Sequence, residues 1–144
     1  MKNTIAYLCL TMLLTLLSGC GTSPTPLYQA INAPSNRVYE KPPIQSSMPS
    51  SLTLIRDSGL MGIEHVFEFR VNGYLVTELE SGEKLTFPVD PGTVIIEVRM
   101  FNVLGKVAPA QIETTFAPGR NYVYRAGLDD QLHLSLIRDT DLSR

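Results

Sequence analysis

Few side chains in this chain could carry out chemistry. There are two cysteines, Cys9 and Cys20, and two histidines, His65 and His133. The histidines lack the i, i+4 spacing of a helical metal site, and neither has a cysteine beside it, so we expect no metal centre. The sequence contains no Gly-x-Ser-x-Gly elbow and no phosphate-cradling glycine loop. It therefore predicts neither catalytic residues nor a cofactor, and an enzyme is the least favoured class.

An apolar run near the N-terminus ends just before Cys20. It covers residues 5–17, IAYLCLTMLLTLL, and follows a single lysine at position 2. A helix of this length rises only about 20 Å, whereas the hydrocarbon core of a bilayer is about 30 Å thick. We therefore interpret the run as the apolar region of a signal peptide. A buried N-terminal helix of the domain is the alternative.

The end of this run, Leu17-Ser18-Gly19-Cys20, resembles the lipobox of bacterial lipoproteins. The resemblance implies that a signal peptidase recognises Leu17, Ser18 and Gly19 and cuts before Cys20. The Cys20 thiol would carry a diacylglycerol, and several acyl chains such as palmitate anchor a protein stably. Cys9 would leave with the signal peptide, so the mature chain would hold no disulfide. Because no aspartate follows the cysteine, the resemblance favours an outer-membrane lipoprotein facing the periplasm.

The lipobox resemblance and the composition together divide the chain into three regions: a signal peptide over residues 1–19, a lipidated cysteine and flexible tether over 20–50, and a β domain over 51–140. The tether contains six of the ten prolines and many Ser, Thr and Asn residues. Proline removes backbone donors and biases the preceding residue away from helix, so we expect no packed element there. Two mildly apolar pieces, PLYQAI and RVYE, leave open the alternative that one of them docks on the domain or on a partner.

From residue 51 the hydrophobic pattern has a period of two, which is typical of half-buried strands. Turn residues separate the runs at regular intervals. The sequence predicts an all-β domain, an antiparallel β-sandwich of seven or eight short strands. The expected strands cover residues 51–56, 65–71, 74–79, 84–89, 93–100, 111–116, 121–126 and 131–137.

One hairpin is predicted in detail. The Asn-Gly dipeptide at 72–73 supplies two residues able to adopt positive φ, the strongest short-range hairpin signal. In a two-residue hairpin Val71 faces Tyr74, and Phe69 faces Val76. These pairs would build one apolar surface.

The segments LIRDSGLMG, FRVNGYLVTELESGEKLTFPVDPG, FAPGRNYVYRAG and LHLSLI together resemble a family of small bacterial lipoproteins of unknown function (DUF2846-like), and more distantly the PEGA domain. The resemblance covers roughly residues 51–138. It implies a transthyretin-like or carboxypeptidase-regulatory-like sandwich. No known catalytic residues come with it, because the matching positions are mostly turn and core residues.

Two irregular loops, 57–64 and 100–110, are richer in Leu, Met, Phe and Val than solvated loops usually are. We expect their apolar side chains to form a contact surface for a protein partner. The alternative is that they cap the open end of the sandwich core. The residues concerned are Leu60, Met61, Phe101 and Leu104.

The net charge of -2 offers no basic field, so we expect no nucleic-acid partner. The favoured function is a lipid-anchored envelope protein, attached to the membrane, whose sandwich acts as an interaction or scaffold module for another envelope protein. A small-ligand or glycan-binding module is the alternative, in which Tyr74, Tyr122 and Tyr124 would supply stacking faces.

Overall fold

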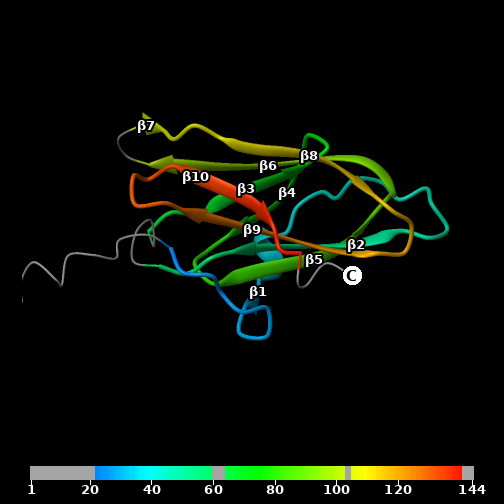
Figure 1. Ribbon diagram of the computed structural model, residues 1–144, viewed down its shortest axis with the longest axis horizontal. Helices are drawn as coiled ribbons and strands as arrows, with labels where there is room; N and C mark the ends of the chain where they lie inside the picture. Colours follow the sequence, from blue (N-terminus) through cyan, green and yellow to red (C-terminus); the bar gives the residue numbers. More distant parts are fainter. Residues whose placement is uncertain (1–21, 60–63, 103–104, 141–144) are drawn as a thin grey trace, which may run out of the picture.

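The computed structural model describes residues 22–59, 64–102 and 105–140, with the backbone alone at 101–102 and 105–106. Two β-sheets pack face to face (Figure 1). The first has the strand order β1-β5-β2-β9-β10, and the second runs β4-β3-β6-β8, with β7 paired to the end of β6. The elements are β1 (Ile31–Asn32), η1 (Ser35–Arg37, a 3-10 helix), β2 (Ser50–Arg56), β3 (Phe67–Val71), β4 (Tyr74–Leu79), β5 (Glu83–Val89), β6 (Gly92–Asn102), β7 (Gly105–Lys106), β8 (Ala110–Phe116), β9 (Asn121–Leu128) and β10 (Leu134–Arg138).

The all-β sandwich is confirmed. Each of the eight expected strands is present, with its ends shifted by at most three residues, and two strands of only two residues, β1 and β7, are added to them. The second sheet is antiparallel at every pairing. The first sheet is mixed, because β2 runs parallel to β9 and β1 runs parallel to β5. A parallel pair needs a long connection, and the second sheet supplies it by lying between β2 and β9 in sequence.

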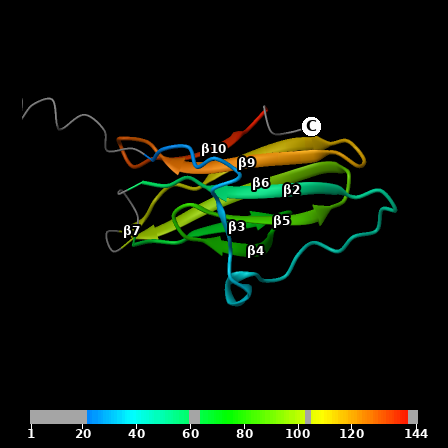
Figure 2. The ribbon, with the colours of Figure 1, turned by 90° about the horizontal axis from the view of Figure 1, so that it is seen from below.

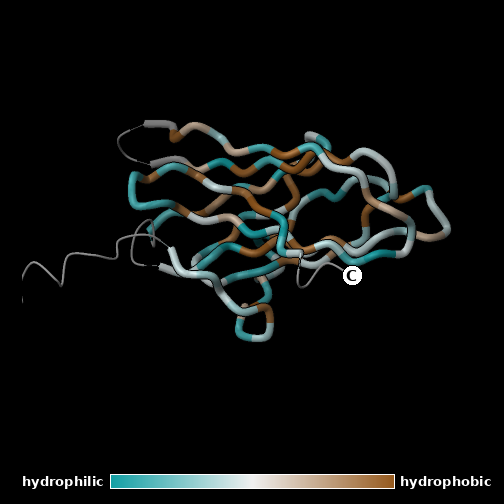
Figure 3. Tube along the Cα trace, in the orientation of Figure 1, coloured by the Kyte–Doolittle hydropathy of each residue, from teal (hydrophilic) through white to brown (hydrophobic). Residues whose placement is uncertain are grey.

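The core lies between the two sheets. Its side chains come from alternate positions of the strands, and Figure 3 shows brown hydrophobic positions alternating with teal ones along the sheets. Phe116 stacks on Tyr122 with ring centroids 3.9 Å apart and planes 2° from parallel. Such aromatic stacking stabilises a core beyond the area it buries. The stack therefore joins β8 of the second sheet to β9 of the first.

The predicted hairpin is present, with a different register beyond its turn. Asn72 and Gly73 have φ of 51° and 85°, and Val71 faces Tyr74 as expected. However, a β-bulge places Phe69 opposite Thr77 instead of Val76. The extra residue has a physical reason: Val76 and Leu79 are three positions apart, so strict alternation would send them to opposite faces, yet both are fully buried in one core cluster.

Residues 22–50, in the region expected to be a tether, lie along the domain, which is the alternative that the segments PLYQAI and RVYE had left open. These residues first cross the outer face of the first sheet, where Leu27 and Ala30 pack against Ile55 and Val123. They then follow the side of the sandwich where β5 and β4 lie (Figure 2). β1 pairs with β5, and the Tyr39 N–H donates to the Val76 carbonyl of β4 at 3.0 Å. We call residues 22–50 the N-terminal wrap.

The wrap has a clear physical basis. A strand at the edge of a sheet leaves unpaired N–H and C=O groups, and covering them is a common solution. Here one segment covers the edges of both sheets, through β1 on β5 and an isolated bridge between Val38 and Thr77 on β4. Proline is tolerated in such an extended segment at a sheet edge, because its fixed φ suits an extended backbone and it has no N–H group to leave unpaired.

Candidate anchoring and interaction site

Arg125 fixes the beginning of the wrap to the domain. It projects from β9 on the outer face of the first sheet and is only 7% exposed. Its Nη1 lies 2.9 Å from Asp57 Oδ1 and donates to the Thr25 carbonyl at 2.6 Å, while its Nε donates to Asp139 Oδ2 at 2.6 Å. One guanidinium therefore joins the wrap, the end of β2 and the residue after β10. We call Thr25, Asp57, Arg125 and Asp139 the Arg125 clamp.

Burial and hydrogen bonding oppose each other in this clamp. Burial raises the pKa of Asp57, although hydrogen bonds from the Thr25 N–H and from Arg125 act to lower it. For Arg125 burial alone would lower the pKa, but its hydrogen bonds to Asp139 and Asp57 raise it overall. The guanidinium therefore stays charged, and charge-assisted hydrogen bonds of this kind are the stronger ones in proteins.

The wrap is attached to the domain from Thr22 onward. The Thr22 N–H donates to the Leu128 carbonyl at 3.0 Å, and its Oγ1 accepts from the Leu128 N–H at 3.0 Å. Ser23 forms a bridge to Ser58. A Cβ on Gly127 would lie 2.3 Å from Thr22 Oγ1, so only glycine at this position leaves room for the threonine. The contacts that the structure describes therefore begin two residues after Cys20.

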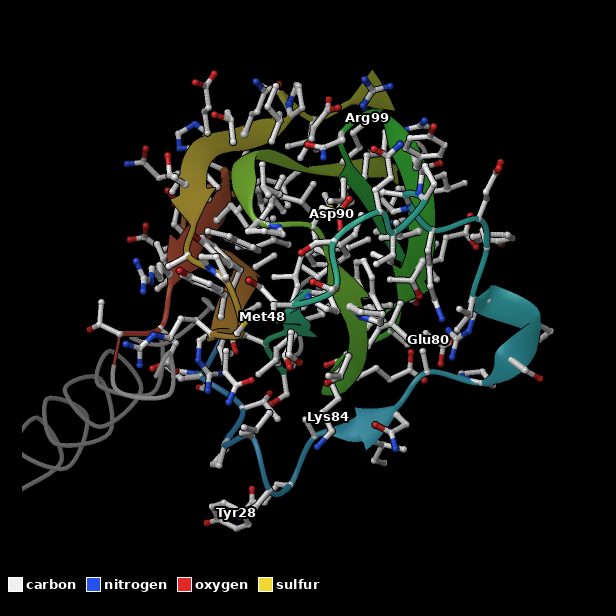
Figure 4. The ribbon with its side chains drawn as sticks, turned by 90° about the vertical axis from the view of Figure 1, so that its right-hand side faces the viewer. Tyr28, Met48, Glu80, Lys84, Asp90 and Arg99 are labelled. Atoms are coloured by element: carbon white, nitrogen blue, oxygen red, sulfur yellow. The ribbon has the colours of Figure 1, made fainter. Side chains whose placement is uncertain are left out.

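Further along the wrap, Arg37 binds the other edge of the sandwich. Its guanidinium lies 2.5 Å from Glu80 and 2.5 Å from Glu83, at the ends of β4 and β5. Its carbonyl accepts from Thr77 Oγ1 at 2.8 Å. Figure 4 shows Glu80 close to the short helix η1. This second cation holds the middle of the wrap as Arg125 holds its beginning.

The wrap ends at the opposite end of the sandwich. The Asp90 carboxylate accepts from the Gln45 and Ser46 N–H groups, both at 2.9 Å. The Met48 carbonyl accepts from the Gly119 N–H. Asp90 follows β5 and Gly119 precedes β9, so the wrap reaches from one end of the sandwich to the other.

Large hydrophobic side chains are exposed mainly on this wrap. Tyr28 is 83% exposed, Ile31 71% and Met48 60%, and no other large hydrophobic residue in the described part of the chain exceeds Ile137 at 56%. Figure 4 shows Tyr28 at the tip of a turn that points away from both sheets. The wrap therefore combines buried contacts on its inner side with an apolar outer surface.

Most of the residues predicted from sequence to be functional lie outside the described residues. These are Leu17, Ser18, Gly19, Cys20, Leu60, Met61 and Leu104, together with the side chain of Phe101, whose backbone is in β6. β7 and the adjoining end of β6, which fall within the loop expected over residues 100–110, lie at the end of the sandwich where the wrap begins (Figure 1). A partner surface on these loops stays a prediction.

The structure also describes His133 and the three tyrosines that were considered for metal or glycan binding. His133 is exposed, and its Nδ1 lies 3.1 Å from Asp129 Oδ2. Across residues 22–59, 64–102 and 105–140, no group of three or more side chains is arranged to hold a metal ion. Tyr122 and Tyr124 lie in the core with 5% and 0% exposure, so they cannot supply the stacking faces expected of a glycan site. Tyr74 alone of the three is exposed to solvent.

The clamp residues Thr25, Asp57, Arg125 and Asp139 were not singled out by the sequence. One signal was available: in NYVYRAGL the outward positions of β9 include Val123, which strict alternation would leave in solvent. An apolar residue such as Val123 on that face indicates that another segment of the chain covers it. The charged Arg125, two positions later, then needs a polar partner in that segment.

No model of a known protein family matches this chain, and no curated protein matches it. In the part of the chain that the structure describes, no helix has the length and apolar character needed to cross a membrane. Function therefore has to be inferred from the residues and contacts themselves.

Replacing Arg125 by methionine should release the wrap. The substitution leaves the Asp57 carboxylate buried without its cation, and breaking a buried pair in this way costs about 3–5 kcal/mol of unfolding free energy. Urea denaturation measures this loss, and limited proteolysis should show new cleavage within residues 22–33.

Arg99→Met is the matched control. Arg99 also forms an ion pair, with Glu97 at 2.6 Å, but its side chain is 43% exposed. Exposed pairs contribute at most about 1 kcal/mol, so this variant should keep nearly all of the stability and the protease resistance of the wrap. Equal losses in the two variants would contradict the role assigned to Arg125.

Proposed function

We propose that this chain is a lipid-anchored cell-envelope protein, cut before Cys20 and held in the membrane by acyl chains on that residue. Its β-sandwich serves as an interaction or scaffold module in the periplasm. The observation that carries the proposal is the sequence Leu17-Ser18-Gly19-Cys20 after an apolar run too short to span a bilayer. The resemblance to small lipoproteins of the DUF2846-like group supports it, as does the absence of an aspartate after the cysteine for an outer-membrane location.

The contacts of the wrap limit how far the sandwich can lie from a lipid on Cys20. Consecutive Cα atoms are 3.8 Å apart, so the Cα atoms of Cys20 and Thr22 can be separated by no more than about 7 to 8 Å. Thr22 is bound to Leu128, and Thr25 is bound to Arg125. A lipid on Cys20 would therefore hold the sandwich directly at the membrane surface, without a long leash.

The other side of the sandwich supports a protein-binding role. Among the described residues, the wrap covers the edges of β4 and β5, whereas β8 pairs only with β6 and β10 pairs only with β9. A strand with a free edge can accept an extended segment of another protein as an added strand. The outer positions of β8 are polar, for example Glu113, which is exposed. We assign the partner-binding role to this free edge of β8.

Metabolic labelling with palmitate tests the anchor. Wild-type chain should incorporate the label, shorten on processing and sediment with the outer membrane, because Cys20 supplies the thioether sulfur. Cys20→Ser should incorporate none. Cys9→Ser is the matched control and should behave like the wild type, since Cys9 is removed with the signal peptide. Label retained in Cys20→Ser would refute the anchor.

Photocrosslinking in intact cells tests the partner-binding edge. A photoreactive p-benzoylphenylalanine in place of Glu113 should give a protein adduct of defined mass. The same residue in place of Thr86 is the control, because Thr86 is also exposed but lies on β5, beside the wrap. The assignment to β8 fails if position 113 gives no adduct, or if both positions give the same adduct.

A further inference from the structure

The outer face of the first sheet differs strongly from that of the second. On the first sheet it is covered by the beginning of the wrap, where Leu27 and Ala30 pack on Ile55 and Val123. On the second sheet it carries ion pairs, Glu68 with Arg70 and Glu97 with Arg99. In Figure 4, Arg99 and Tyr28 lie on opposite sides of the molecule. The wrap begins beside the outer face of the first sheet.

Thr22 lies on the outer face of the first sheet. Its Oγ1 occupies the space that a Cβ of Gly127 would fill, and Gly127 is an outward position of β9, between the core residues Ala126 and Leu128. The chain can place the Cα atom of Cys20 no more than about 7 to 8 Å from that of Thr22. A bilayer that holds the proposed lipid must therefore come close to this face.

The wrap residues nearest to Cys20 are suited to contact with lipid. Residues 22–36 contain no aspartate, glutamate, lysine, arginine or histidine. Within them, Tyr28 and Ile31 are the two most exposed large hydrophobic side chains of the described chain. Tyrosine is enriched where a membrane meets water, because its ring is apolar and its hydroxyl is polar. No charge would have to be desolvated for this turn to enter the headgroup region.

One cation stands beside the turn. Lys84 of β5 donates from Nζ to the Leu27 carbonyl at 2.8 Å, and Figure 4 shows it next to the turn that carries Tyr28. A lysine at this position is attracted to anionic headgroups. By contrast, the turn between β9 and β10, near the same end of the sandwich, exposes the carboxylates of Asp129 and Asp130, which anionic lipids would repel.

From these observations we propose that Tyr28 and Ile31 form a membrane-contact site, which lays the outer face of the first sheet on the bilayer beside the anchor. The inference rests on the proposed lipidation of Cys20. It goes further, because it fixes the orientation of the domain: the charged face of the second sheet and the free edge of β8 are turned away from the lipid.

Tryptophan fluorescence tests the site with little background, because the chain contains no tryptophan. Tyr28→Trp is introduced into the full lipidated chain and reconstituted in vesicles of phosphatidylethanolamine and phosphatidylglycerol with brominated acyl chains. An interfacial side chain lies about 5–10 Å into the headgroup and acyl boundary, so bromine should quench the emission of the introduced tryptophan about twofold or more.

Two matched variants complete the test. Met48→Trp places the probe on the same wrap at the far end of the sandwich, and Leu132→Trp places it on the turn that carries Asp129 and Asp130; both side chains are exposed in the wild type. Neither tryptophan should be quenched. Ile31→Ser in the Tyr28→Trp background should reduce the quenching, because it removes the second apolar contact.

Vesicle flotation in the same samples separates the possible failures. Chain that floats while the probe at position 28 is not quenched overturns the membrane-contact site and leaves the anchor intact. Quenching of the probe at position 132 in place of the one at position 28 also overturns the site, because the acidic end would then face the lipid. Chain that does not float contradicts the anchor itself, and with it the inference.

Discussion

The buried charge of Arg125 is the interaction on which the arrangement of this protein depends. A guanidinium that is taken out of water must find partners, because leaving it unpaired would cost several kcal/mol. Three of its hydrogen bonds go to three different parts of the chain, through Asp57, Asp139 and the Thr25 carbonyl. The wrap supplies one of these partners, the Thr25 carbonyl, so the clamp fixes the beginning of the wrap against the first sheet.

The wrap covers the edge strands on one side of the sandwich and leaves those on the other side uncovered. On one side β1, η1 and the residues around Tyr39 cover the edges of β5 and β4, which removes two sites for unwanted strand pairing. On the other side β8 and β10 end the described sheets without a further strand. A lipid anchor next to the covered side and a partner on the open side are compatible, because the two surfaces do not compete.

The sequence predicted the strands well because their signals are local. Alternation and turn dipeptides such as Asn72-Gly73 act within a few residues, and all eight expected strands form. Docking of PLYQAI or RVYE on the domain was only an alternative, and its partners were not predicted, because the contacts join distant residues: Thr25 pairs with Asp57, and Thr22 pairs with Leu128, 106 positions away. The bulge in β4 was missed for a related reason, since it serves the burial of both Val76 and Leu79 in the tertiary core. The candidate site depends on such long-range contacts, so composition alone indicated a tether.

Hydrogen exchange of individual backbone amides in the lipidated chain tests the central claim, that the wrap is a bound part of the domain, most directly. The N–H groups of Thr22, Thr25, Ile31 and Ala33 all donate to acceptors of the domain. We predict that they exchange slowly and as a group, within about tenfold of one another, because this part of the wrap opens as one unit. Exchange of these four amides at the rates of an unprotected chain, while β2 stays protected, would contradict the account.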